Sequence, residues 1–349
     1  MASSLRDNPA WASARGLVLL SALAFGAFLL VWLLAVQTEI GQRIDQGALA
    51  GGRQTPETAR DAADNLLRVV SIGSLVAATA ALSALAWLRR RPGLLLIPAA
   101  VIGLSLFATE AFKHIIFERP DLITDPKLRA NSYPSGHTTV AVAIGLSAVL
   151  IAPPRLRTAV GFAAAALAAT AGVFVVTADW HRPSDPIGSY LLTLSTAAAC
   201  MAALRLWIPA QRTRTHRAVS ARAGAVRLEL SAMLAGAALF VGSLVIASLR
   251  YGAEVDWNRF QAAFLLAAAV IVVVAGLAVA ALLRALEPGG AADGRRSRLA
   301  SWPPSQDRDA PPPGATRPRP ERSADERPPN EPGRDRNGGA GQLRRGEPV

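Results

Sequence analysis

Three short polar clusters stand out in this 349-residue chain because each one borders a long apolar stretch. They are EAFKHIIFERPDL (110–122), NSYPSGH (131–137) and DWHRPSDPIG (179–188). Together they hold three of the four histidines and one of the two lysines of the chain. Cationic side chains and the backbone N–H groups of a helix N-terminus are the groups that bind phosphate. The clusters therefore point to phosphoryl transfer.

The residue types in these clusters could supply each part of such a reaction. Ser135 offers a hydroxyl donor before an expected helix, and Gly136 lets the backbone approach an oxyanion closely. The imidazole of His137 could protonate a leaving oxygen. A second imidazole, that of His181, could attack phosphorus if a carboxylate fixed its tautomer. Asp185 lies four residues further on and would share one face with it in a helical turn.

Each of these residues also has an ordinary structural explanation. Lys113 could extend from a helix end, with Glu110 as its partner three residues earlier. His137 could be a surface histidine, and Asp185 could cap a helix ahead of Pro186. Metal binding is a further competing use, but no His-x3-His or similar ligand pair is present. For each residue taken alone, the ordinary explanation is favoured. Taken together, three clusters that each bring a cation or an imidazole to the same side favour one common phosphate site.

The apolar runs between the clusters predict an all-α integral membrane protein, because a spanning helix needs about 20 mostly apolar residues. Eight spans are expected, six of them in a core and two in a C-terminal pair. Their approximate limits are 16–36, 68–88, 94–113, 138–152, 158–178, 187–207, 228–248 and 262–284.

The basic residues predict which way the spans are oriented. Arginine-rich connections follow the second, fourth and sixth spans, which places those connections in the cytoplasm. Both termini are then cytoplasmic, and all three polar clusters face the outside of the cytoplasmic membrane. The net charge of +12 is explained by this asymmetry, so we expect no nucleic-acid partner.

The chain has a single cysteine, Cys200, which excludes an intrachain disulfide or a cysteine-based metal cluster. The predicted spans and their connections divide the chain into five parts. The last part is rich in Pro, Gly, Arg and Asp and is expected to be disordered. The parts are a cytoplasmic N-terminus (1–15), a six-span core (16–207), a basic cytoplasmic loop (208–227), a two-span hairpin (228–284) and a cytoplasmic tail (285–349).

In order and topology the clusters resemble the motifs of the type 2 phosphatidic acid phosphatases (PAP2), a family related to the vanadium haloperoxidases. The family pattern is Lys-x6-Arg-Pro, then Pro-Ser-Gly-His, then Ser-Arg-x5-His-x3-Asp. This chain has KHIIFERP (113–120), PSGH (134–137) and HRPSD (181–185) at the corresponding points. The resemblance covers roughly 60–207 and implies a six-helix phosphatase core.

The resemblance also implies a role for each matching residue. His181 would be the nucleophile that forms a phosphohistidine, Asp185 would orient it, and His137 would be the general acid. A second set would hold the phosphate oxygens, namely Lys113, Arg119, Ser135 and the backbone of Gly136. No metal or organic cofactor is expected in this family.

The chain departs from the family pattern at two points. Lys113 and Arg119 are separated by five residues instead of six, a shift of about 100° if the segment were helical, although a loop could absorb it. The Ser-Arg of the third motif is absent, and Phe174 and Val175 occupy its place. Arg182, next to the expected nucleophile, could replace the missing arginine.

Two hypotheses follow, both with a membrane lipid phosphate and the bilayer as partners. The first is a metal-independent phosphatase that acts on a phosphatidate-like or polyprenyl phosphate or diphosphate at the outer membrane face. The alternative is a catalytically weak or inactive relative that binds or transports lipid phosphates. A phosphatase for soluble substrates is a weaker third option.

Overall fold

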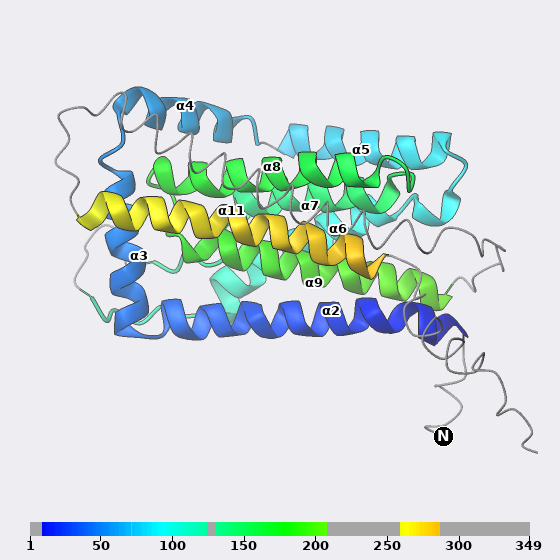
Figure 1. The fold of residues 1–349 in the computed structure, drawn as a ribbon, viewed down its shortest axis with the longest axis horizontal. Coiled ribbons are helices and arrows are strands. Elements are labelled where there is room, and N and C mark those ends of the chain that lie inside the picture. The colour runs from blue at the N-terminus through cyan, green and yellow to red at the C-terminus, as the bar shows by residue number, and fades with distance from the viewer. Residues whose placement is uncertain (1–8, 71, 124–129, 208–258, 287–349) are drawn as a thin grey trace, which may run out of the picture. The chain divides into compact units, whose positions relative to one another are not determined.

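The structure is a computed structural model that describes residues 9–70, 72–123, 130–207 and 259–286. Within these ranges every regular element is a helix and no strand occurs, so the predicted all-α class is confirmed for this part of the chain (Figure 1). The described residues all fall within one unit, Met1–Gly294.

The long apolar runs form long helices, and short π-helical or 3-10 turns extend some of them. In chain order the elements are α2 (Pro9–Val31), η1 (Trp32–Val36), α3 (Glu39–Gly52), α4 (Glu57–Arg68), α5 (Ile72–Leu88), η2 (Pro92–Leu94), α6 (Ile97–Ala111), η3 (Phe112–Ile116), α7 (Gly136–Ile151), α8 (Arg157–Thr177), α9 (Ser184–Trp207) and α11 (Arg259–Ala285).

Five helical segments of the described chain are long and apolar enough to cross a membrane, and α4 with α5 makes a sixth if this pair, bent by 60°, is one span. Helix α7 is apolar but has only 16 residues. The five segments are Ala14–Val36, Pro92–Ile116, Arg157–Thr177, Ser184–Trp207 and Arg259–Ala285. They agree with five predicted spans and support a membrane protein.

Three segments predicted for the C-terminal half lie outside the described residues. The predicted basic loop (208–227) and the seventh span (228–248) lie outside the described residues. The same holds for the predicted tail from residue 287 onward. The count of eight spans therefore stays a prediction.

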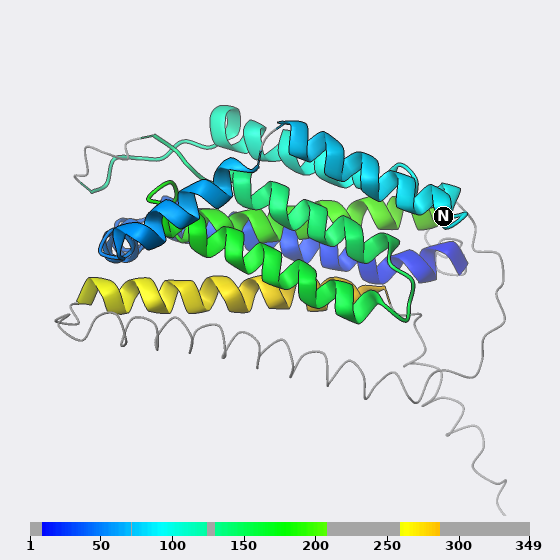
Figure 2. The ribbon, with the colours of Figure 1, turned by 90° about the horizontal axis from the view of Figure 1, so that it is seen from above.

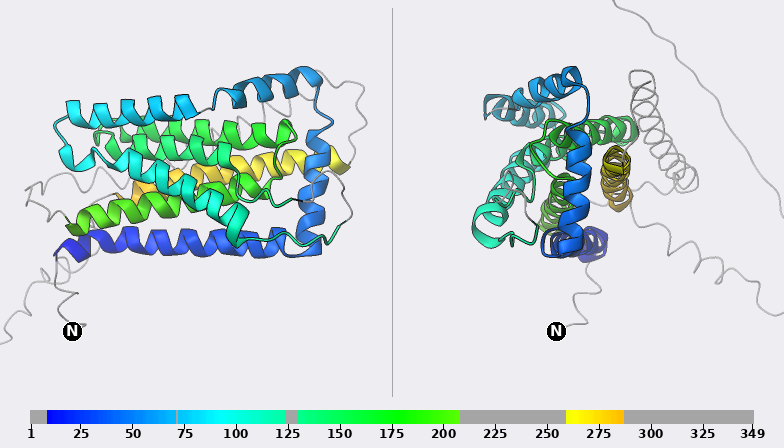
Figure 3. Two further views of the ribbon diagram at one scale, coloured as in Figure 1. Left: turned by 180° about the vertical axis from the view of Figure 1, so that it is seen from behind. Right: turned by 90° about the vertical axis from the view of Figure 1, so that its left-hand side faces the viewer.

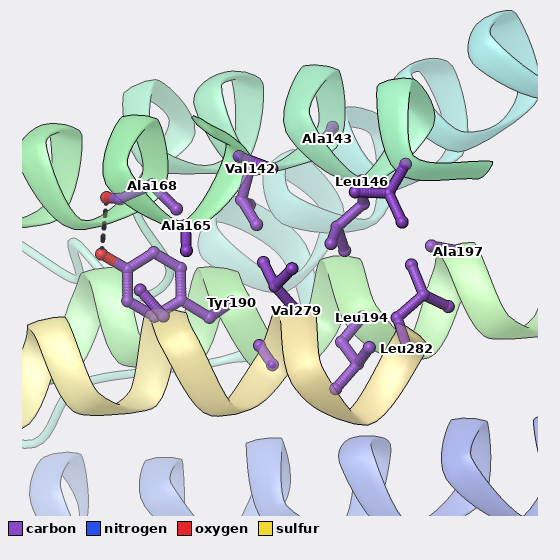
Figure 4. Packing of buried hydrophobic residues seen from close by; sticks show 14 of the residues in the cluster. Val142, Ala143, Leu146, Ala165, Ala168, Tyr190, Leu194, Ala197, Val279 and Leu282 are labelled. Carbon is purple, nitrogen blue, oxygen red and sulfur yellow. Dashed lines mark hydrogen bonds between the residues drawn. The ribbon is translucent and has the colours of Figure 1, made fainter. Parts of the chain in front are cut away.

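Helix α9 lies at the centre of the bundle, where it contacts α2, α6, α7, α8 and α11. Figure 2 shows α11 along one flank and α5 with α6 along the other. Small residues allow the close packing: a Cβ added to Gly172 would lie only 1.9 Å from the Tyr190 hydroxyl. That hydroxyl donates a hydrogen bond of 2.8 Å to the carbonyl of Ala168, as Figure 4 shows beside Leu146 and Leu194 of the same core.

Helix α3 runs across one end of this bundle instead of along it (Figures 1 and 3). It belongs to the connection between the first two predicted spans (37–67), which is expected on the outer side of the membrane and contains α3 and, except for Arg68, α4. Helix α11 packs against α3 as well as α8. The loops that carry the first and third polar clusters lie at the same end of the bundle as α3, because each of these two loops contacts α3 or its neighbouring turn.

Candidate active site

The three polar clusters meet in space, as their common predicted face requires. Asn131 donates from Nδ2 to the carbonyl of Lys113 at 3.1 Å, which joins the first cluster to the second. The hydroxyl of Ser132 donates to Asp185 Oδ2 at 2.7 Å, which joins the second cluster to the third. The backbone N–H of Ser135 donates to the carbonyl of Asp185 at 3.3 Å. One site is therefore built from segments up to 72 residues apart, from Lys113 to Asp185.

His181 and Asp185 form the pair that their spacing predicts. His181 Nδ1 lies 3.0 Å from Asp185 Oδ2, and the carboxylate is fully buried while the imidazole is 12% exposed. Because a carboxylate accepts hydrogen bonds, Nδ1 carries the proton and Nε2 keeps its lone pair. Helix α9 begins at Ser184, so Asp185 lies inside the helix and does not serve as its N-cap. The geometry is that of a nucleophile oriented by a third group.

Asp185 Oδ2 also accepts two further hydrogen bonds that hold it in place. Its donors are the hydroxyl of Ser132 at 2.7 Å and the backbone N–H of Arg182 at 3.0 Å. The carboxylate lies in the first turn of α9, where the helix dipole stabilises a negative charge. Three hydrogen-bond donors and the helix N-terminus thus stabilise the negative charge of the buried Asp185 carboxylate, which could in turn stabilise a positively charged imidazole.

Arg182 lies inside the site although its backbone position is not that of the missing motif arginine. Its side chain is almost fully buried, and Nη1 donates to the hydroxyl of Ser132 at 3.2 Å. Val175, in the motif position, is buried and contributes only its carbonyl, which accepts the N–H groups of Trp180 and His181 at 3.0 Å. A guanidinium group therefore returns to the site from a position seven residues later in the chain.

Arg119 reaches the same region through a loop. Helix α6 ends in the π-helical turn η3, which the N–H of Phe117 closes by donating to Phe112 O at 2.9 Å. Phe117 is extended, so the chain leaves the helix before Arg119 and the missing residue of the motif costs no helical rotation. Both Nη atoms of Arg119 are buried and have no hydrogen-bond partner among the described residues.

The electrostatic surroundings of Arg119 place it beside the other charged groups. Burial lowers the pKa of Arg119, and the positive charge of Arg182 lowers it further. The charges of Asp185 and Asp45 act in the opposite direction. Two guanidinium groups that repel each other, one with unpartnered Nη atoms, form a site suited to an anion with several oxygens.

Lys113 and His137 border this region from the ends of α6 and α7. Lys113 Nζ lies 3.4 Å from Glu110 Oε1, which confirms the ordinary helical pairing, yet a Cβ on Gly136 would also be only 3.7 Å from Nζ. The ring of His137 packs edge-on against Trp180, with 4.9 Å between ring centroids. His137 also lies within electrostatic range of His181.

Ser135 acts as the N-cap of α7 in the structure. Its Oγ accepts the backbone N–H of Thr138 at 3.4 Å, and its carbonyl accepts the hydroxyls of Thr139 and Ser189, both at 2.8 Å. The predicted phosphate contact of Ser135 stays a prediction beside this capping role. The cap fixes where the first N–H groups of α7 lie, including that of Gly136.

An aromatic cluster holds the first two motif segments against α2. It consists of Phe28, Trp32, Phe112, Phe117 and Tyr133. Close approach to α9 depends on Gly188, because a Cβ there would meet the Tyr133 ring at 2.4 Å. The hydroxyl of Tyr133 donates to Phe28 O at 2.7 Å.

Three polar residues of this region were missed by the sequence reasoning: Asn131, Ser132 and Asp45. The first two stand inside the second cluster, so their neighbourhood was the available signal. Asp45 lies in α3, and its carboxylate accepts the N–H of Ser184 at 3.1 Å as well as the Ser184 hydroxyl. No local pattern around Asp45 indicates this contact. Among the described residues no group of three or more His, Cys, Asp or Glu side chains could hold a metal ion.

Comparison with known families identifies the segment that carries the site. Residues 94–209 match the model of the PAP2 superfamily, and neither a curated protein nor a solved structure matches the chain. The matched segment includes α6, α7, α8 and α9, whereas α2, α3 and α11 lie outside it. Proteins of this superfamily are generally phosphatases, which supports a phosphoric ester hydrolase. The resemblance predicted from the motifs is thus confirmed by the match of residues 94–209 to the PAP2 superfamily.

Proposed function

We propose that this protein hydrolyses a phosphomonoester or diphosphate of a membrane lipid, phosphatidate-like or polyprenyl, through a phosphohistidine intermediate. The observation that carries the proposal is the His181–Asp185 pair at 3.0 Å. The Ser132 hydroxyl donates to the same Asp185 carboxylate and accepts a hydrogen bond from Arg182. Arg119 adds a second guanidinium group whose buried Nη atoms have no partner among the described residues.

Substrate binding would use the cations and the start of α7. The guanidinium groups of Arg119 and Arg182 would contact the phosphate oxygens, and Lys113 would approach them from the side of Gly136. The backbone N–H groups at the start of α7 favour an anion because they lack partners within the helix. Charge that develops on the phosphoryl oxygens in the transition state would be stabilised by these fixed donors.

In the first chemical step, His181 Nε2 attacks phosphorus and forms a nitrogen–phosphorus bond while the phosphorus–oxygen bond to the lipid breaks. His137 donates a proton to the leaving oxygen, which departs as an alcohol or as a lipid monophosphate. The Asp185 carboxylate stabilises the positive charge that the His181 ring acquires.

In the second step a water molecule attacks the phosphohistidine. His137, now neutral, accepts a proton from this water as the nitrogen–phosphorus bond breaks. Inorganic phosphate leaves, His181 regains its Nε2 lone pair and His137 is again protonated. Two histidines and one carboxylate are thus sufficient for a complete cycle.

A lipid substrate is favoured by the apolar surface that leads to the site. Phe107, Ile115 and Ile116 are exposed along α6 and η3, the same segment that carries Lys113. A lipid tail could follow this surface laterally from the bilayer while its phosphate enters between the clusters. We propose that the site faces the outside of the cytoplasmic membrane, with both termini in the cytoplasm, because the connections at the opposite end are rich in arginine.

The experiment that tests the proposal measures inorganic phosphate released by the detergent-purified protein from phosphatidate, polyprenyl phosphate and polyprenyl diphosphate, with chelator and no added metal. His181→Ala should abolish release, whereas His114→Ala should not, because His114 is an exposed histidine of the same face. Label from 32P-phosphatidate should be trapped in acid-labile form on the wild type and be absent from His181→Ala. Wild-type turnover in His181→Ala would exclude this nucleophile.

The second candidate function, lipid-phosphate binding or transport without chemistry, is favoured by one observation. The arginine of the third motif is replaced by the buried Val175. Saturable lipid binding without acid-labile label or phosphate release would support this candidate. A preference for short-chain over long-chain substrates would instead support a phosphatase of soluble esters.

A further inference from the structure

Helix α3 contacts the site from outside the family-matched segment. It lies across the end of the bundle and holds loops that belong to the first and third clusters (Figure 3). Its residues do not match any motif, and α3 is absent from the segment 94–209. The role of α3 therefore depends on which loops and helix ends its side chains contact.

The first contact is between Asp45 and the start of α9. The Asp45 carboxylate accepts the backbone N–H of Ser184 at 3.1 Å and the Ser184 hydroxyl. Ser184 is the first residue of α9 and immediately precedes Asp185. The first N–H groups of a helix have no partner inside it, and a carboxylate placed there acts as a cap and interacts favourably with the helix dipole. Asp45 therefore caps α9 from a distant part of the chain.

Two further contacts hold the neighbouring loops. Arg53, which follows α3, donates from Nε to Asp179 Oδ1 at 2.7 Å. Asp179 has a φ of 62°, in the left-handed region, and lies where the chain turns from α8 toward His181. Gln42 is buried and donates from Nε2 to the carbonyl of Pro120 at 2.7 Å, next to Arg119. The nucleophile loop and the Arg119 loop are thus held by one helix.

The second half of α3 buries the apolar residues Ala48 and Leu49, whereas its first half has the opposite polarity. Ile40 and Ile44 are 72% and 67% exposed, whereas Gln42 and Asp45 are buried. Burial raises the pKa of Asp45 to about 7, and the nearby charge of Asp185 contributes to this increase. Burying a carboxylate beside another is unfavourable, and an apolar residue of similar volume is often at least as stabilising. Fold stability alone therefore does not explain an acid at this position.

We infer that Asp45 is a positioning residue of the phosphate site, which holds the start of α9 through Ser184 and thereby fixes Asp185 and the His181 ring. The inference rests on the proposed function. It assigns Asp45 no contact with substrate, so its loss should lower kcat and leave KM nearly unchanged. A displacement of about 1 Å in a catalytic group can cost about 10²-fold in rate.

The experiment compares Asp45→Ala, Asp45→Asn and the control Glu39→Gln in the full-length protein in detergent. Glu39 lies on the same helix and pairs with Arg43 on the exposed surface. With phosphatidate in mixed micelles, Asp45→Ala should lower kcat about 10- to 100-fold and change KM by less than about 3-fold. Asp45→Asn should recover part of the loss because its amide oxygen still accepts the Ser184 N–H. Glu39→Gln should match the wild type.

A second measurement separates this inference from the proposed function. Orthovanadate, which adopts the five-coordinate geometry of the phosphoryl-transfer transition state when a nucleophile binds it, should raise the Tm of the wild type, and its apparent Kd should increase about 10-fold in Asp45→Ala. A wild type that binds orthovanadate but hydrolyses no lipid would overturn the proposed function and retain the positioning role. Unchanged kcat and orthovanadate affinity in folded Asp45→Ala would overturn the positioning role.

Two remaining outcomes are also decisive. If Asp45→Ala does not fold, Ser184→Ala removes only the hydroxyl side of the contact, and an unchanged kcat in both Ser184→Ala and Asp45→Asn would overturn the inference. A wild type that neither hydrolyses lipid nor binds orthovanadate would overturn both the inference and the proposed function.

Discussion

The two sides of the candidate site differ in what their polar groups contact. On the inner side, contributed by the family-matched segment, His181, Arg119 and Arg182 gather around the buried carboxylate of Asp185. On the outer side, Gln42 and Asp45 of α3 contact loop backbone and the residue that starts α9. Most of the groups proposed to react are thus recognisable by type and spacing, whereas their supports are defined by tertiary contacts.

This difference leads to an ordering of effects. A group that interacts with the reacting atoms contributes most in the transition state, so its removal lowers kcat strongly. A group that acts through another residue changes geometry and has a smaller effect.

His137→Gln removes the proposed general acid, and we expect kcat to fall by about 10²- to 10⁴-fold. The loss should depend on the substrate, because an aryl phosphate releases a more stable leaving group that needs no proton. Phosphatidate hydrolysis should therefore be impaired far more than 4-nitrophenyl phosphate hydrolysis, measured as kcat for each substrate.

His114→Gln is the matched control for this prediction. His114 is an exposed histidine that pairs with Glu110 at 3.2 Å, so turnover should be unaffected. An equal loss with both substrates in His137→Gln would contradict the role of a general acid and indicate a binding or structural role.

Arg182→Lys tests whether a guanidinium from the loop replaces the missing motif arginine. Lysine keeps the charge but loses the planar fork that donates to two oxygens, so we expect a loss of about 10²- to 10³-fold in kcat. The measurement is phosphate release at saturating phosphatidate, with Arg68→Lys as the control because Arg68 is exposed and pairs only with Asp64 among the interactions of the described residues. Full activity of Arg182→Lys would show that only charge is needed at this position.

The inner side of the site was largely predictable from sequence, and the reason is local chemistry. The four-residue spacing of His181 and Asp185 indicated this pair, although only Asp185 lies in α9, and Ser135 and Gly136 follow from a turn before an apolar run. That Arg182 could replace the motif arginine was only a possibility from sequence, because the direction of its side chain depends on a contact with Ser132, 50 residues away in the chain.

The outer side was not predictable, and α3 shows why. The sequence places 37–67 outside the membrane but gives no reason for a helix across the bundle end. An amphipathic interpretation would bury Ile40 and Ile44, whereas the structure exposes them and buries Asp45. The partner of Asp45 is 139 residues away in sequence, so no periodic pattern could reveal the contact.

The smallest expected effect concerns stability and comes from Asp45 itself. Its pKa in the folded protein is about 7, above its usual value of 3.8, so between these two pH values the folded state binds a proton that the unfolded state has lost. Asp45 therefore contributes stability at low pH that is lost as pH rises toward about 7, and no further loss occurs above that value. Asp45→Asn cannot titrate, so its Tm should rise relative to the wild type by about 5 °C more at pH 8 than at pH 4. Thermal unfolding of both proteins in detergent across this range checks the prediction, with Glu39→Gln as the control. A constant Tm difference at all pH values would show that the pKa of Asp45 is the same in the folded and unfolded states. Asp45 would then hold the start of α9 without the electrostatic cost that is inferred from its burial.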